Sequence, residues 1–83
     1  MMSMTNKTIF DPKYKSMIES LILLRKKRGM NQRELAKQMD VAHCYIGRVE
    51  TCERRLDIME LIKILRIFKL SDKQILDFLK QVL

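Results

Sequence analysis

The feature of the sequence that most constrains the fold is a three-residue break, Asp40-Val41-Ala42, within the stretch NQRELAKQMDVAHCYIGRVE at residues 31–50. Apolar residues keep helical spacing up to Met39, and the spacing resumes by Ile46. Because three residues are too few for a loop, the chain must turn sharply and fix the second helix at a steep angle to the first. The pattern predicts two short helices joined at a tight corner.

The rest of the chain also favours helices. Its 83 residues include only 2 Gly and 1 Pro, and no stretch alternates apolar and polar residues as a strand would. Asp11-Pro12 can cap and open a first helix, which Gly29 would end. Three capping boxes are expected to open later helices, at Asn31, Asp57 and Ser71. We therefore predict a flexible tail at 1–10 and a single all-α domain of five helices at 11–83.

The net charge of +7 favours a polyanionic partner, either nucleic acid or an acidic membrane surface. No segment approaches the roughly 18 consecutive apolar residues of a membrane span, and the start MMSMTNK lacks the apolar core of a signal peptide. A cytoplasmic protein is expected, without membrane contact.

Metal and cofactor chemistry are not expected from these residues. Cys44 and Cys52 form no disulfide pattern, and His43 and its neighbour Cys44 would point about 100° apart on a helix. We expect no metal site and no cofactor. No acid, base and nucleophile converge in the pattern, so an enzyme is not expected.

A projection of the second helix, about 42–51, at about 100° per residue shows which of its residues face inward and which face outward. Ile46 and Val49 fall on the inner side, and Cys44, Gly47 and Arg48 fall on the opposite side. The major groove of B-DNA, about 12 Å wide, accepts one such projecting helix. The pattern thus indicates a helix that is anchored on one face and free to meet base edges with the other.

The chain from about Leu21 to Leu70 resembles a known family. The resemblance rests on LRKKRGMNQRELAKQMDVAHCYIGRVE and on ERRLDIMELIKIL, which match the helix-turn-helix domain of the Cro and lambdoid-repressor type, also called the Xre family. It implies a five-helix lambda-repressor-like fold that binds double-stranded DNA. The family prefers glycine where this chain has Asp40 and Cys52. We expect Asp40 to accept a left-handed backbone with moderate strain, and Cys52 either to do so at a cost of about 1 kcal/mol or to let the helix run on.

The resemblance also implies roles for individual residues. An internal ion pair would join Arg25 to Glu50. The expected base contacts are His43, Cys44, Gly47 and Arg48. The expected phosphate contacts are Asn31, Gln32, Arg33, Tyr45, Arg54 and Arg55. Several alternatives stay open: plain N-capping for Asn31, a phosphate instead of a base for Arg48, a solvated surface for His43, and packing for Tyr45.

The last two helices carry more apolar surface than a bundle of this size can easily cover. A homodimer interface is therefore expected from Ile64, Ile67, Phe68, Phe78, Leu79 and Val82. The predicted function is a homodimeric transcriptional regulator, of repressor type, that reads a palindromic operator. The alternatives are an antitoxin or a restriction-modification controller of the same fold, the first with a partner protein, or a protein-interaction module that uses the apolar surface of the last two helices.

Overall fold

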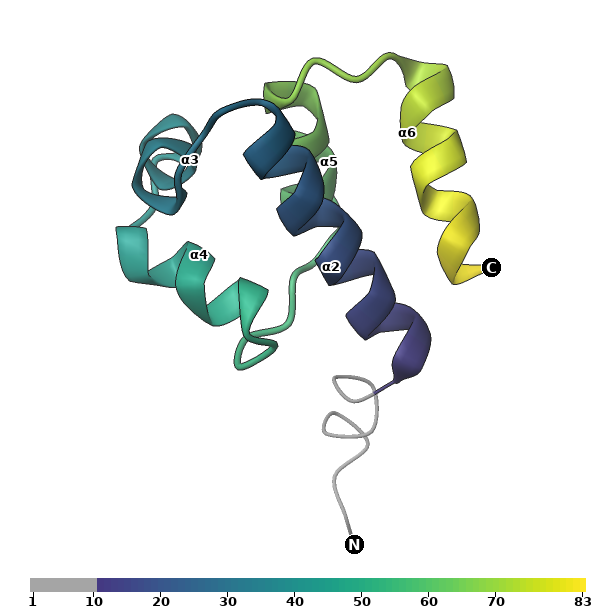
Figure 1. Cartoon of the computed structure of the whole chain (residues 1–83), viewed down its shortest axis with the longest axis horizontal. Coiled ribbons are helices and arrows are strands. Elements are labelled where there is room, and N and C mark those ends of the chain that lie inside the picture. The colour runs from purple at the N-terminus through teal and green to yellow at the C-terminus, as the bar shows by residue number, and fades with distance from the viewer. Residues whose placement is uncertain (1–10) are drawn as a thin grey trace, which may run out of the picture.

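The computed structural model describes residues 11–83, and the predicted tail at 1–10 lies outside them. Within 11–83 the chain forms five α-helices, one short 3-10 helix and no strand, so the all-α, five-helix prediction is confirmed. The helices, coloured along the chain in Figure 1, are α2 (Pro12–Lys27), α3 (Gln32–Met39), α4 (His43–Glu50), α5 (Ile58–Ile67) and α6 (Asp72–Leu79), followed by η1 (Lys80–Val82). None of these helices has the length and apolar character that crossing a bilayer requires.

The helices begin where their capping residues predicted. The Asp11 side chain accepts a hydrogen bond from the Lys13 N–H, and Pro12 opens α2. Complete capping boxes open α3 at Asn31, α5 at Asp57 and α6 at Ser71. Each box satisfies two backbone N–H groups that have no partner inside the helix, which fixes where the helix starts.

Four helices end in the same way, on a residue with a left-handed backbone. These residues are Gly29, Asp40, Cys52 and Lys69, with φ between 60° and 69°. After each helix the next two N–H groups bond back to the last turn; after α3, Val41 donates to the Ala36 carbonyl at 3.0 Å and Asp40 to the Lys37 carbonyl at 3.1 Å. This is the Schellman arrangement, in which the left-handed position is usually occupied by glycine. Asp40 therefore turns the corner as expected, and Cys52 keeps the left-handed cap.

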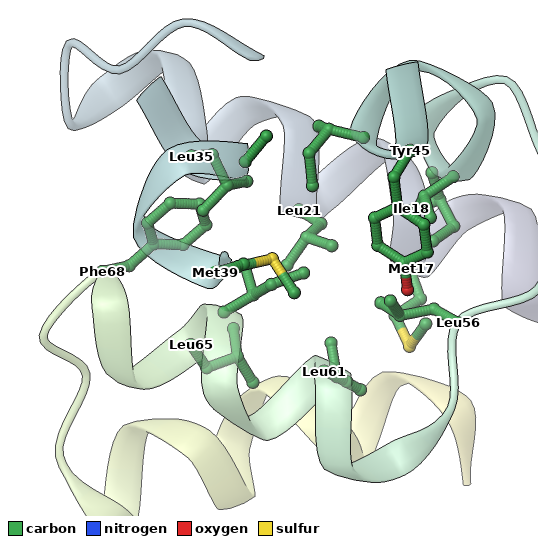
Figure 2. Close-up of a cluster of buried hydrophobic side chains, with 14 of the residues drawn as sticks. Met17, Ile18, Leu21, Leu35, Met39, Tyr45, Leu56, Leu61, Leu65 and Phe68 are labelled. Carbon is green, nitrogen blue, oxygen red and sulfur yellow. The ribbon is translucent and has the colours of Figure 1, made fainter. Parts of the chain in front are cut away.

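One hydrophobic core joins all five helices (Figure 2). The α2 helix contributes Met17, Ile18 and Leu21, and α3 contributes Leu35, Ala36 and Met39. Further along the chain the buried apolar residues are Tyr45, Ile46, Val49, Leu56, Leu61, Ile64, Leu65, Phe68, Leu70 and Ile75. Because α4 is anchored by Ile46 and Val49, each 1% exposed, its opposite face is left on the outside of the molecule.

Candidate nucleic-acid interface

The outward face of α4 carries polar and small side chains. His43, Cys44 and Arg48 are exposed, and Gly47 is half-buried. The helix lies at the edge of the molecule, just after α3 (Figure 1). All four residues expected to contact bases therefore belong to one short helix, and the left-handed residue Cys52 closes its C-terminal end. Their contact with bases stays a prediction.

A buried carboxylate fixes how α4 sits against α2 and α3. Glu50, at the end of α4, accepts hydrogen bonds from Arg25 Nε at 2.7 Å, from Arg25 Nη2 at 3.1 Å and from Gln32 Nε2 at 2.8 Å. The side chains of Arg25 and Glu50 are each 9% exposed. Arg25 Nη1 also donates to the Met30 carbonyl at 2.8 Å. The expected pair is thus a forked, fully hydrogen-bonded one, which is the geometry in which an ion pair tolerates burial.

The start of α3 forms a cationic hollow beside the start of α4. Its volume is about 530 Å³, and it is lined by Arg25, Asn31, Gln32, Arg33 and His43. The Asn31 side chain caps α3, so the capping interpretation holds for it. Gln32 gives one amide N–H to Glu50 and lies against α4, where a Cβ on Gly47 would sit 3.5 Å from its Oε1. Arg33 is exposed, and its contact with a phosphate stays a prediction.

The predicted phosphate contact of Tyr45 is wrong, because Tyr45 belongs to the core. The residue is 9% exposed, and its enclosed hydroxyl has no hydrogen-bond partner among residues 11–83. Figure 2 shows it among the buried side chains. Burial, followed by the nearby Glu60 carboxylate, raises the pKa of Tyr45 to about 12. The packing alternative is therefore the one that the structure adopts.

Arg54 and Arg55 follow α4 and are both exposed. The Arg54 guanidinium carbon lies 4.7 Å from the centre of the Tyr45 ring, which is within the range of a cation–π contact. The sequence does not reveal this contact, because it depends on how the chain folds back after Cys52.

The comparison with protein families decides the identity of the domain. A helix-turn-helix family model matches residues 21–75, which is about two thirds of the chain. The chain belongs to this family. It is a helix-turn-helix domain of the Cro and lambdoid-repressor type, as its residues predicted. The α4 helix is the second helix of the motif, the position that is called the recognition helix in this fold. No curated protein matches the chain.

Membership of the helix-turn-helix family carries a DNA-binding regulatory role. It agrees with the exposed polar face of the recognition helix and with the cations around it. Among residues 11–83, no three His, Cys, Asp or Glu side chains come together as metal ligands would. Cys44 is exposed and Cys52 is half-buried, and both are free thiols.

Two residues assigned to the dimer interface are placed elsewhere by the fold. Ile64 and Phe68 are each 1% exposed and belong to the core, so their assignment to an interface is wrong. They are buried because they lie on the side of α5 and its C-terminal end that belongs to the hydrophobic core. The remaining four, Ile67, Phe78, Leu79 and Val82, are half-buried at the core boundary. Leu76 on α6 is 62% exposed and was not assigned.

Proposed function

We propose that this protein is a sequence-specific transcriptional regulator, of repressor type, that places α4 in the major groove of an operator. The observation that carries the proposal is the combination at α4. One face is buried in the core, the Arg25–Glu50–Gln32 hydrogen bonds hold its end, and the opposite face presents His43, Cys44 and Arg48. A helix held in this way can present donors and acceptors to base edges without reorganising.

Arg48 and Arg33 would have different tasks at this interface. Arg48 lies on the outward face of the recognition helix and can fork onto guanine, a contact worth about 1–3 kcal/mol of discrimination. Arg33 lies at the start of α3, in the cationic hollow, where a phosphate contact would add affinity for any sequence. The matched control is Lys69, an exposed cation in the α5–α6 connection, away from α4 (Figure 1).

Selection from a pool of random duplex DNA tests the proposal. The expected result is an enriched palindrome. Arg48→Ala should relax preference at one position of each half-site, Arg33→Ala should weaken binding uniformly, and Lys69→Ala should change binding least. Absence of enrichment would overturn the proposal and favour a protein-interaction module. Binding of such a module to DNA would show no steep dependence on salt.

We further propose that the protein binds as a homodimer through α6, with two recognition helices in successive major grooves about 34 Å apart. The support is α6 itself, which buries Ile75 in the core and leaves Leu76 62% exposed beside half-buried Phe78 and Leu79. Sedimentation equilibrium at low micromolar concentration should detect a dimer. Leu76→Glu should shift it to monomer, whereas Leu23→Glu, at a 67% exposed position on α2, should not. Equal effects of both substitutions would place the interface elsewhere.

A further inference from the structure

The segment after the recognition helix is folded back tightly against that helix. The Arg48 carbonyl accepts hydrogen bonds from two backbone N–H groups, that of Glu53 at 2.8 Å and that of Arg54 at 3.1 Å. Thr51 strengthens the turn, since its hydroxyl lies 3.1 Å from the Gly47 carbonyl and 2.9 Å from Glu53 Oε2. The backbone of Arg54 is thereby fixed at the end of α4, next to the outward-facing Arg48.

The side chain of Arg54 is also held, by the Tyr45 ring. The guanidinium carbon lies 4.7 Å from the ring centre, and the ring is fixed because Tyr45 is part of the core. No ion pair within residues 11–83 involves Arg54. A guanidinium that stacks on an aromatic face keeps its N–H edges free, and its ordering costs less when a ligand arrives. Arg54 is therefore an exposed, charged group that is already oriented.

We propose that Tyr45 is a positioning residue whose ring holds the Arg54 guanidinium for a backbone phosphate at the edge of the groove that α4 enters. This inference rests on the proposed function. It assigns the role to the ring and not to the hydroxyl, since the hydroxyl is enclosed and has no partner among the described residues. The neighbouring Arg55 is also exposed, but no cation–π contact within residues 11–83 includes it. Arg55 is therefore the matched control.

The test is a double-mutant cycle read by the Kd for duplex DNA and by its salt dependence. Arg54→Gln should weaken binding and lower the slope of log K against log salt by about 0.9 per protomer, as loss of one phosphate contact does. Tyr45→Phe should leave both values unchanged. Tyr45→Leu, which keeps apolar bulk but removes the aromatic face, should weaken binding about two- to fivefold, the equivalent of an exposed cation–π contact.

The coupling between the two positions decides the inference. In the Arg54→Gln background, Tyr45→Leu should have no further effect, whereas in the Arg55→Gln background it should keep its full effect. Equal losses of affinity in both backgrounds would mean that Tyr45 acts only through the packing of α4. Loss of DNA binding in Tyr45→Phe would mean that the hydroxyl, and not the ring, has the positioning role. Either result overturns the proposal, as does an Arg54→Gln variant with unchanged Kd and slope.

A second measurement does not depend on DNA and guards against a Leu variant that folds poorly. The Nε proton of Arg54 should show an upfield ring-current shift in the free wild type and in Tyr45→Phe, and a shift near the random-coil value in Tyr45→Leu. A random-coil chemical shift for the Arg54 Nε proton in the wild type would refute the proposal that the Tyr45 ring positions Arg54. Wild type that binds no duplex, with the ring-current shift present, would instead refute the proposed function and leave the stacking intact.

Discussion

The Lys69→Gly variant should be more stable than the Lys69→Ala variant. Lys69 ends α5 with φ 64°, and its side chain is exposed. Its N–H bonds to the Arg66 carbonyl at 2.8 Å and the next N–H, of Leu70, bonds to the Leu65 carbonyl at 3.1 Å, so the left-handed conformation is part of the helix end. The backbone cannot relax to a commoner conformation without breaking these bonds.

The magnitude follows from two opposing terms. A residue with a Cβ pays about 1–2 kcal/mol in the left-handed region, and glycine avoids this cost. Glycine loses more backbone entropy on folding, a cost of about 0.5–1 kcal/mol. Lys69→Gly should therefore exceed Lys69→Ala by about 0.5–1 kcal/mol in free energy of unfolding, or about 2–8 °C in Tm for a domain of this size. Both variants lose the same charge and no packing, so the difference isolates the backbone.

Urea denaturation followed by circular dichroism, at one fixed protein concentration, measures the difference. The m values should be equal, and the midpoint of Lys69→Gly should be higher. A glycine variant with the same midpoint as alanine, or a lower one, would show that the helix end can rearrange at no cost, and the strain argument would fail.

Asp40→Gly should preserve or raise both stability and DNA affinity, and a clear loss of either in urea melts or binding titrations would reveal a role for the aspartate. Arg25→Ala should lower the free energy of unfolding by about 3–5 kcal/mol and weaken DNA binding, because it leaves the buried Glu50 carboxylate without its partner; retained affinity would contradict this. Because the pKa of Tyr45 is raised from 10.0 to about 12, its contribution to stability is complete below pH 10 and is lost as pH rises through 12, a loss that Tyr45→Phe should lack. In a Tyr14→Phe variant, the absorbance of tyrosinate should report this late ionisation.

Local sequence signals predicted most of the fold. Capping boxes at Asn31, Asp57 and Ser71 predicted three helix starts, and the helical spacing of apolar positions predicted the anchoring face of α4. These features involve residues within about four positions of one another, where sequence spacing and spatial neighbourhood coincide. Lys69 shows the limit, since a lysine gives no local sign that its backbone will be left-handed.

The errors in the candidate site came from contacts between distant segments. Projection of a helix places Tyr45 at the flank, but the ring enters the core because α5 and the chain around Leu56 enclose that side. Counting apolar surface assigns Ile64 and Phe68 to an interface, but both side chains are buried in the core of the protomer. Helical periodicity says which residues share a face, and tertiary packing decides whether that face meets solvent.

The three side-chain hydrogen bonds that hold the C-terminal end of the recognition helix all have the Glu50 carboxylate as their acceptor. One oxygen of Glu50 accepts from both Arg25 Nη2 and Gln32 Nε2, while the other accepts from Arg25 Nε. Rotation of α4 about its axis would move the Glu50 carboxylate away from all three donors at once, because these donors belong to two other helices, α2 and α3. Removing Gln32 alone would leave the forked arginine contact in place. We therefore expect Gln32→Ala to affect DNA binding more than stability, and Arg25→Ala to affect both. Similar losses of stability in the two variants would show that the amide, too, is needed to hold the helix.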